Sequence, residues 1–501
     1  MLNVELRMMK EEEGIRGLYQ VPSTKYKVGI RVLTQIVLLR DHGTLYLVLN
    51  TWYLVLSTLY NVSPAIFFSL IHFSFIRIKC IFAANLLGMA VLLQHLKLLN
   101  QGKFSPPKDY SFSNGTLSPV AQNEKGSYDQ VIDCSNYLAS KGWIDLRCGI
   151  GEPGHEYRET VESLCTTLLA SGFSKAVVLP NTHPVIQTKS EVSFLQNKAA
   201  NFTPELAILG AVTKNTDGED LTEMLDMHYQ TGITLFGDGT KPLSNTDRYL
   251  KILYYLQKFE GTLFDHAYDP LLAIFGQMHE GETSTQLGMK GIPSLAEDVA
   301  IQRNLDLLRY SGGKVHFQTL STAKGVDLIR KAKKEGLHVS ADVSIYQLLF
   351  SDQDLTSFDT HLKVMPPFRA ASDRKALIEG LMDGTIDALV SNHQPQDFDS
   401  KFCEFDHATF GMVGLQAFLP AMGFLAEELG WELLLEKVTS GPEKVLQTEN
   451  NSWTFFDPKE TWTYNEQSNT SLSANHPWFG KELTGKVKFC IQKGQLIQVN
   501  V

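Results

Sequence analysis

The sequence has no concentration of basic residues. Its 45 Lys and Arg are outnumbered by 55 Asp and Glu, which gives a net charge of −10 and a pI near 5.8. Proteins that bind nucleic acids generally carry a basic patch or stripe, because binding depends on neutralising phosphate charge. This composition argues against a general nucleic-acid-binding function, so we expect no nucleic-acid partner. With 43% hydrophobic and 20% charged residues, it is typical of a globular protein that handles a small molecule.

Cysteine is scarce and irregularly spaced. There are six cysteines, and no two of them form a Cys-x-x-Cys motif. Scattered cysteines are typical of reduced thiols in a cytosolic protein, so we expect a cytoplasmic protein with no disulfide framework and no cysteine zinc site. The six positions are Cys80, Cys134, Cys148, Cys165, Cys403 and Cys490.

Asp, Glu, Lys and Arg are all absent from positions 43–76. A run of about 18 or more apolar residues without charge is a candidate membrane span, here a hairpin that turns near residues 61–64. A second interpretation is that residues 1–88 are translated upstream sequence, because the pattern of the remaining fold begins at Met89. We favour the second interpretation, and expect a membrane association only if residues 1–88 are a genuine part of the protein.

Strands and helices alternate regularly through the middle of the chain. Short apolar runs bounded by turn residues predict eight buried strands of the kind found in parallel sheets. Eight strands with helices between them over roughly 300 residues predict a (β/α)8 TIM barrel, an α/β fold, over residues 141–440. An open doubly wound sheet is the alternative, but we identify no dinucleotide-binding glycine motif after an early strand. The predicted strands begin at Ile144, Lys175, Leu206, Gly232, Gly261, Lys314, His338 and Ile386.

Residues that can accept hydrogen bonds from a helix N-terminus mark two helix starts. We expect Ser321 or Thr322 to cap the helix after the sixth strand, and Ser372 or Asp373 to open the helix after the seventh. Shorter strands separated by turn signals fill residues 89–140 and 445–501. Segments at opposite ends of a domain commonly lie together, so these two should form one small β domain.

The most informative motif follows the first predicted barrel strand. It reads Asp145-Leu-Arg-Cys-Gly-Ile-Gly-Glu-Pro-Gly154. It resembles Asp-x-His-x-His-x-Arg-Glu-Pro-Gly, the pattern found there in the dihydroorotase family of the amidohydrolase superfamily. Further strings in the same order extend the resemblance from about Met89 to Val501. They include Leu179-Pro-Asn-Thr182, Ala296-Glu-Asp, Lys363-Val-Met-Pro-Pro-Phe-Arg369, Asp383-Gly-Thr-Ile-Asp387, Phe410-Gly-Met-Val-Gly-Leu415 and Ser473-Ala-Asn-His-Pro-Trp-Phe-Gly480.

The resemblance implies a zinc cofactor, but this chain replaces most of its ligands. In the family one or two zinc ions polarise the ring amide and activate water, and an aspartate on the last strand handles the proton. Asp238 and His266 match residual metal-ligand positions. Catalytic zinc needs about three or four protein ligands, and neither guanidinium nor amide is a good one, so we expect weak or absent zinc. The replaced ligand positions are Arg147, Gly149, Thr319 and Asn392, of which Asn392 stands in the catalytic-aspartate position.

The resemblance also indicates how a substrate would be held. Asn181 matches a residue that contacts the substrate carboxylate, while Gly151 replaces the substrate arginine and Gln396 a substrate-binding histidine. Arg147 introduces a cation where the family has a metal ligand. We expect it to pair with a carboxylate and to supply a fixed positive charge, and the candidate partners are Asp145, Asp238 and Asp265.

Three functions are compatible with these observations. The first is a divergent, catalytically impaired or non-catalytic homologue in pyrimidine biosynthesis with an assembly role. The family includes degraded members that are structural partners of aspartate carbamoyltransferase, so we expect that partner and a homo-oligomer. The second is an active dihydroorotase or cyclic-amide hydrolase, converting carbamoyl-aspartate to dihydroorotate with Asp238, His266 and His393. The third is a membrane-tethered amidohydrolase-like protein. The number of lost ligands favours the first.

Overall fold

The chain divides into two compact units, residues 1–82 and 83–501. The computed structural model describes residues 16–20, 35–41, 44–49, 90–100, 102–120 and 127–500, the first three ranges as backbone alone. In the first unit, β1 (Arg16–Gln20), β2 (Gln35–Asp41) and β3 (Thr44–Leu49) form an antiparallel sheet in that order. The remainder of the predicted membrane hairpin and the expected start at Met89 lie outside the described residues. No helix among those residues is long and apolar enough to cross a membrane.

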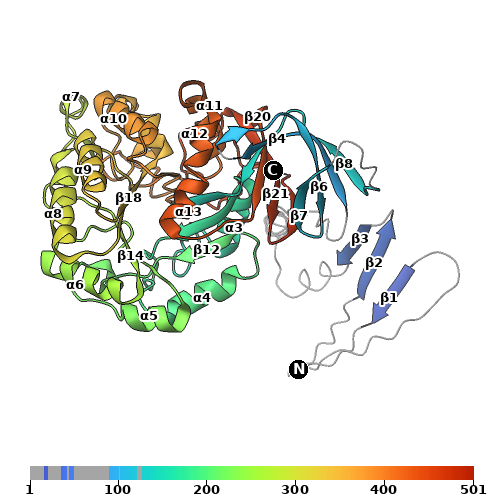
Figure 1. Cartoon of the computed structure of the whole chain (residues 1–501), viewed down its shortest axis with the longest axis horizontal. Coiled ribbons are helices and arrows are strands. Elements are labelled where there is room, and N and C mark those ends of the chain that lie inside the picture. Colours follow the sequence, from blue (N-terminus) through green and yellow to red (C-terminus); the bar gives the residue numbers. More distant parts are fainter. Residues whose placement is uncertain are drawn as a thin grey trace, which may run out of the picture. The chain divides into compact units, whose positions relative to one another are not determined.

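Eight parallel strands form a closed barrel in the second unit (Figure 1). Two ladders contain most of the pairing, β10-β11-β12 and β13-β14-β17-β18-β19. Parallel bridges close the circle, from Gly210 to Phe236 between the ladders and from Cys148 to His393 at the other seam. The eight predicted barrel strands are confirmed. They are β10 (Trp143–Cys148), β11 (Phe173–Val178), β12 (Glu205–Ile208), β13 (Leu235–Phe236), β14 (Thr262–Asp265), β17 (Val315–Phe317), β18 (Val339–Ser344) and β19 (Ala388–Val390).

One sequence argument against an open sheet was wrong. Gly149-Ile-Gly-Glu-Pro-Gly154 has the spacing Gly-x-Gly-x-x-Gly and follows β10 directly. In a dinucleotide-binding fold this motif leads into a helix whose N-terminus faces the pyrophosphate. Here α3 begins only at Val161. The closure of the sheet, and not the lack of a glycine motif, therefore excludes the open fold.

Helices surround the barrel, with α4, α5, α6 and α8 along its outer side in Figure 1. As predicted, Thr322 caps α9, because its hydroxyl accepts a hydrogen bond from the Gly325 amide at 3.0 Å. The other cap prediction was wrong, because α10 begins before Asp373, whose carboxylate accepts from the Ala323 amide of α9 instead. The helices are α3 (Val161–Ala170), α4 (Lys189–Ala199), α5 (Met224–Thr231), α6 (Thr246–Leu256), α7 (Glu282–Gln286), α8 (Leu295–Ser311), α9 (Ala323–Lys334), α10 (Ala371–Met382), α11 (Phe418–Leu429), α12 (Trp431–Glu436) and α13 (Ser440–Leu446).

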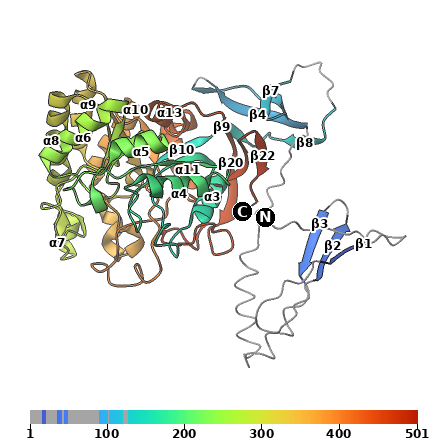
Figure 2. The same cartoon turned by 90° about the horizontal axis from the view of Figure 1, so that it is seen from below.

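A nine-stranded sheet combines both ends of the second unit (Figure 2). Its two halves meet where β9 pairs with β20, with Trp453 opposite Lys141. The two end segments therefore share one sheet, which belongs to the same compact unit as the barrel; their division into a separate β domain stays a prediction. A separate short pair is formed by β15 (Met278–His279) and β16 (Gly291–Ile292). The nine strands are β4 (Val91–Asn100), β5 (Lys103–Phe104), β6 (Lys108–Ser113), β7 (Thr116–Pro119), β8 (Gln130–Asp133), β9 (Leu138–Lys141), β20 (Trp453–Thr463), β21 (Glu482–Gln492) and β22 (Gln495–Gln498).

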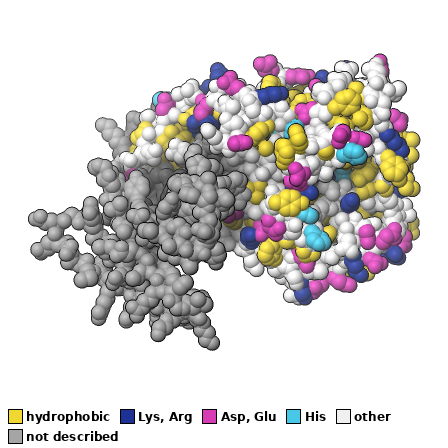
Figure 3. All heavy atoms as spheres, turned by 180° about the vertical axis from the view of Figure 1, so that it is seen from behind, with side chains coloured by type: hydrophobic (Ala, Val, Ile, Leu, Met, Phe, Trp, Pro, Cys, Tyr) yellow, Lys and Arg dark blue, Asp and Glu magenta, His cyan; other side chains and the backbone are white. Residues whose placement is uncertain are grey.

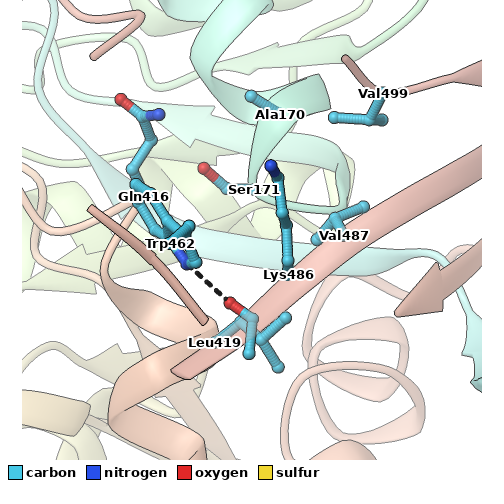
Figure 4. Close-up of a pocket in the computed structure, with 9 residues that line it drawn as sticks. Ala170, Ser171, Gln416, Leu419, Trp462, Lys486, Val487 and Val499 are labelled. Carbon is cyan, nitrogen blue, oxygen red and sulfur yellow. Dashed lines mark hydrogen bonds between the residues drawn. The ribbon is translucent and has the colours of Figure 1, made fainter. Parts of the chain in front are cut away.

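Apolar side chains fill the barrel and its junction with the β domain. The barrel strands contribute an interior cluster that includes Ile144, Val177 and Phe264, all fully buried. Where α3 meets β20 and β21, Trp462 donates its indole N–H to the Gly485 carbonyl at 2.9 Å (Figure 4). The crevice beside it has a volume of about 20 Å³. That space can hold about one water molecule and is far smaller than a small-molecule pocket of about 300–1,000 Å³.

Charged side chains of both signs are mixed on one face of the molecule (Figure 3). Lys and Arg side chains on the face in Figure 3 are scattered among acidic ones and do not gather into one basic patch.

Candidate functional site

Five polar side chains meet at the carboxyl ends of the barrel strands, where TIM-barrel enzymes place their active sites. Arg147 belongs to β10, His266 follows β14, and Asn392 follows β19. Gln318 and Thr319 follow β17. Each is at least nine-tenths buried, so their hydrogen bonds decide what the site can hold.

Arg147 is the central group of this site. Its Nε donates to Asn392 Oδ1 at 2.9 Å, and its Nη1 donates to Gln318 Oε1 at 2.7 Å and to the Gly239 carbonyl at 3.3 Å. The side chain is 1% exposed, and burial lowers its pKa to about 10. A group with that pKa remains protonated at neutral pH. The site therefore contains a fixed cation held by neutral oxygen acceptors.

The predicted carboxylate partner of Arg147 was wrong. Among the described residues the guanidinium forms no salt bridge, and its acceptors are two side-chain amides and one backbone carbonyl. Asp145 accepts from the backbone amides of Arg147 and Ser391 and from the Ser391 hydroxyl. Asp265 accepts from Tyr249 and Asn304. These carboxylates accept from other donors and form no hydrogen bond with the guanidinium, although the charge of Asp145 raises the Arg147 pKa.

Asp238, predicted as a residual metal ligand, also accepts hydrogen bonds from other residues of the chain. Its Oδ1 accepts from the amides of Val212 at 3.1 Å and Thr213 at 3.0 Å, and its Oδ2 accepts from the Thr213 hydroxyl at 2.5 Å. Burial raises the pKa of this carboxyl to about 6. Asp238 therefore fixes the loop after β12 to the end of β13, and its oxygens already have partners.

His266 is the second predicted ligand, and it is less constrained. Its Nδ1 lies 3.2 Å from the Thr319 hydroxyl, while its Nε2 is buried and has no hydrogen-bond partner. Burial, reinforced by the charge of Arg147, lowers its pKa well below the usual value, so the imidazole is neutral. A neutral imidazole can bind a metal, but one ligand does not make a site. No group of three or more His, Cys, Asp or Glu in the described part of the chain could hold a metal ion.

The donor set of this site therefore does not fit zinc. The protonated Arg147 occupies one ligand position, Thr319 and Asn392 offer neutral oxygens, and Gly149 offers no side chain. Two of these positions also have unusual backbones, because Thr319 has a φ of 51° and Asn392 a φ of 47°. Left-handed φ values are costly for a β-branched residue and cluster at functional sites. The strained backbone is present here although both side chains are unsuitable as ligands.

Close packing prevents simple restoration of the missing side chains. A Cβ at Gly149 would lie 2.9 Å from the His393 carbonyl oxygen. A Cβ at Gly151, the substrate-arginine position, would lie 2.1 Å from the His155 carbonyl oxygen. Both contacts are with backbone, so the loops after β10 and β19 would have to move.

The predicted substrate position Asn181 is engaged by the protein. Its Nδ2 donates to the Asp238 carbonyl at 3.0 Å, and its Oδ1 accepts from the Thr240 amide at 2.8 Å. It lines, with Gly151 and Gln396, a cavity of about 60 Å³. Small-molecule pockets usually have volumes of about 300–1,000 Å³. The role of Asn181 in substrate binding stays a prediction, but the cavity is small for such a role.

His393 is a buried residue next to Asn392, and it contacts neighbouring loops. Its Nε2 lies 3.3 Å from Glu159 Oε2, and its Nδ1 accepts from the Gly414 amide at 3.2 Å. Both side chains are fully buried. Sequence reasoning missed Glu159 and Gln318, although Gln318 directly precedes the replaced position Thr319 and that adjacency is a usable signal.

Comparison with known proteins identifies the family. A family model described as Dihydro-orotase-like matches residues 138–325. The dihydroorotase of Syntrophus aciditrophicus is 32% identical over 403 residues, 78% of this chain and 94% of its own length. That of Anaeromyxobacter dehalogenans is 34% identical over 398 residues, covering 77% and 92% respectively.

Solved structures show the same fold at lower identity. An L-hydantoinase (dihydropyrimidinase) from Arthrobacter aurescens has a TM-score of 0.72 and 20% identity, covering 81% of this chain and 96% of its own. A dihydropyrimidinase from Brevibacillus agri has a TM-score of 0.69 and 15% identity, with coverages of 81% and 95%. Together with the identities above, this similarity shows that the chain belongs to the dihydroorotase family of TIM-barrel amidohydrolases.

Proposed function

We propose that this chain is a non-catalytic dihydroorotase homologue that serves pyrimidine biosynthesis as an assembly component. The observation that carries the proposal is Arg147, a buried cation bound to three neutral acceptors at a metal-ligand position. Zinc would have to displace or share space with a protonated guanidinium, and like charges repel strongly where water is excluded. The family members that this chain resembles are named dihydroorotases, which supports the pathway.

The proton-transfer chemistry is also missing. Cyclisation of carbamoyl-aspartate requires a base that gains a proton and an electrophile that polarises the reacting carbonyl. Asn392, in the catalytic-aspartate position, carries an amide that cannot accept a proton near neutral pH. Its Oδ1 already accepts from Arg147, and its Nδ2 donates to the Met365 carbonyl at 3.3 Å. Asn392 therefore fixes the position of Arg147 by a hydrogen bond and has no acid–base role.

One observation favours an alternative, an active cyclic-amide hydrolase with an altered site. The unpartnered Nε2 of His266 is a buried polar atom that a ligand could satisfy. This alternative also requires Asp238 and His393, but both side chains already contact other residues of the chain, Asp238 the amides of Val212 and Thr213 and His393 the carboxylate of Glu159. We therefore place this alternative second.

In this assembly role, the chain forms a homo-oligomer in the cytoplasm. The homo-oligomer binds aspartate carbamoyltransferase as its partner. Support for the partner comes from the family resemblance. The intact barrel and β domain support a scaffold, because the fold is retained at strand ends where the ligands are replaced. A scaffold function needs the surface of the barrel and not its centre.

Metal content and activity of the full chain test the proposal together. We expect substoichiometric zinc by mass spectrometry and no cyclisation of carbamoyl-aspartate or hydrolysis of dihydroorotate above background. The dihydroorotase of Syntrophus aciditrophicus, purified in the same way, is the positive control. Stoichiometric zinc with a turnover of about 1 per second or faster would overturn the proposal. Co-elution with aspartate carbamoyltransferase in size-exclusion chromatography tests the partner separately.

A further inference from the structure

A large open groove lies beside the barrel mouth. It has a volume of about 860 Å³ and is lined by the loop after β10, residues 358–361, residues 396–404 and residues 472–475. We call it the aromatic groove, after the large apolar side chains that line it. They are Tyr157, Phe358, Phe398, Phe402 and Leu472.

These apolar side chains are unusually exposed. Phe402 is 77% exposed, Phe398 71% and Tyr157 58%. The rings of Phe398 and Phe402 stack, with centroids 4.8 Å apart and an interplanar angle of 20°, so they present a flat platform to solvent. A contiguous exposed apolar surface costs solubility and commonly marks an interaction site. The platform has no role in the barrel core.

Two buried lysines hold the groove in shape. Lys401 Nζ donates to the Thr360 carbonyl at 2.9 Å and to the Lys363 carbonyl at 3.3 Å. Lys363 Nζ donates to the Phe405 carbonyl at 2.7 Å and to the Asp406 carbonyl at 3.0 Å. These bonds tie the loop after β19 to residues 360–363. A site that is already formed loses little conformational entropy on binding.

The lining carries more negative than positive charge. Its carboxylates are Asp359, Asp397 and Glu404. Asp397 pairs with Arg158 at 3.2 Å and Asp359 with the His361 ring at 2.8 Å, whereas the exposed Glu404 has no salt bridge in the described part of the chain. Lys401 is the only Lys or Arg on this lining among the described residues, and burial lowers its pKa to about 7. Its Nζ donates to backbone carbonyls and not into the groove. An acidic rim beside flat aromatic faces suits a cation, which gains both Coulombic and cation–π attraction.

We propose that the aromatic groove binds a segment of a partner polypeptide in which Lys or Arg alternates with apolar residues. The apolar side chains would cover Phe398 and Phe402, and a cation would face Glu404, the lining carboxylate that has no salt bridge in the described part of the chain. The volume is within the range of peptide and ligand pockets. The proposal rests on the assembly role, for which it names a docking surface.

Fluorescence anisotropy with the full chain tests this proposal. The probe is a fluorescein-labelled peptide of alternating Arg and Leu, and the matched peptide of alternating Glu and Leu is the charge control. We expect binding of the Arg peptide alone, weakened about tenfold or more by Phe398→Ser with Phe402→Ser, and weakened similarly by Glu404→Lys. Tyr310→Ser, which removes an aromatic side chain that is 77% exposed on α8, should leave binding unchanged.

A second readout locates the peptide. Cys403 lines the groove and is partly exposed, whereas the other cysteines that the structure describes are buried. Alkylation of Cys403 by iodoacetamide, followed by peptide mapping, should slow when the Arg peptide is bound. Equal binding of both peptides, equal binding by all variants, or unprotected Cys403 would overturn the proposal. So would a concentration-dependent dimer that the Phe398→Ser and Phe402→Ser changes abolish, because the occupant would then be a second copy of this chain.

These outcomes are separate from those for the proposed function. A chain that binds zinc and turns over dihydroorotate but also binds the Arg peptide would refute the non-catalytic role and retain the groove. A zinc-free, inactive chain that binds neither peptide would retain the non-catalytic role and refute the groove.

Discussion

At the residue scale, Arg147 shows how a buried cation can be held without a direct salt bridge, with the charges of Asp342 and Asp145 nearby helping to keep it protonated. Its three acceptors are oxygens of Asn392, Gln318 and Gly239, each the negative end of an amide dipole. Hydrogen bonds from a charged donor are stronger than neutral ones, which offsets part of the cost of removing the guanidinium from water. The planar fork of Arg reaches all three acceptors at once, and the single ammonium of Lys cannot.

Substitution of Arg147 should therefore destabilise the protein. We expect Arg147→Met to lower the free energy of unfolding by about 1–3 kcal/mol, since three buried acceptors lose their donor while the cost of burying the charge is relieved. Arg147→Lys should not restore stability. Urea unfolding measures both, and Arg248→Met, at a partly exposed surface ion pair, should change stability by less than about 1 kcal/mol. An Arg147→Met protein more stable than wild type would mean that the hydrogen bonds do not offset desolvation.

The buried carboxyl of Asp265 predicts a pH dependence. Its Oδ2 accepts from Tyr249 and Asn304, its Oδ1 has no partner, and burial raises its pKa to about 6 from 3.8. Because the folded-state pKa is above the unfolded value, the folded protein binds the proton more tightly between these values. This contribution to stability is full below about pH 4 and is lost as the pH rises through about 6.

Asp265→Asn should remove that contribution. The fall in the free energy of unfolding between pH 4 and pH 6 should become smaller by up to about 3 kcal/mol, the equivalent of two pKa units. Urea titrations at several pH values measure the slope. Asp327→Asn, on the surface of α9, is the control and should leave this slope unchanged. Identical slopes in wild type and Asp265→Asn would show that the carboxyl titrates normally.

At the element scale, much of the fold could be predicted because its signals are local. The strands of a barrel are short apolar runs, and each predicted run forms a strand. Helix ends were harder. Thr322 caps its helix as predicted, whereas Asp373 is used between helices, to bind the Ala323 amide. A side chain that can cap its own helix can equally serve a neighbour, and only the packed structure decides which.

Glycines in two elements give a matched prediction. A Cβ at Gly151 or Gly149 would meet backbone at 2.1 Å and 2.9 Å, whereas at Gly423 in α11 the nearest atom is 3.9 Å away. We expect Gly151→Ala to destabilise by more than about 2 kcal/mol and Gly149→Ala by about 1–3 kcal/mol. Gly423→Ala should stabilise by up to about 1 kcal/mol, since Ala favours helix. Thermal and urea unfolding measure the stability of the three variants. Equal changes in the free energy of unfolding for all three would contradict this packing.

At the scale of the whole molecule, the site could be predicted only in part. The replaced ligand positions were visible because they interrupt a known motif at Arg147, Gly149, Thr319 and Asn392. The partners of Arg147 were not, because Gln318 and Asn392 lie 171 and 245 residues away in sequence. Carboxylates are the usual acceptors for Arg, but Asp145 accepts from Ser391 and Asp265 accepts from Asn304, both distant in sequence. Long-range hydrogen bonds among neutral groups leave no periodic pattern in sequence.

This arrangement predicts that the stability of the full chain is independent of metal. Neither zinc nor a chelator should change the thermal midpoint of the wild-type protein, because Arg147 stands where a metal ligand would be and does not bind zinc. The triple variant Arg147→His, Thr319→His, Asn392→Asp keeps His266 and supplies up to four ligands. Zinc at a hundred to a thousand times its dissociation constant should then stabilise it by about 3–4 kcal/mol. Adding His266→Ala to the triple variant should remove most of that gain.

Restored metal binding should still leave little activity. Gly151 and Gln396 replace the arginine and histidine that would hold the substrate, and positioning contributes much of an enzyme's rate. Adding Gly149→His should not improve zinc binding, since its Cβ would lie 2.9 Å from the His393 carbonyl oxygen. Calorimetric titration with zinc and a dihydroorotate assay measure both properties. If zinc stabilised the wild-type protein as strongly as the triple variant, other residues would form a metal site. His155 and His183, whose ring centroids are 6.3 Å apart, would be the first residues to substitute.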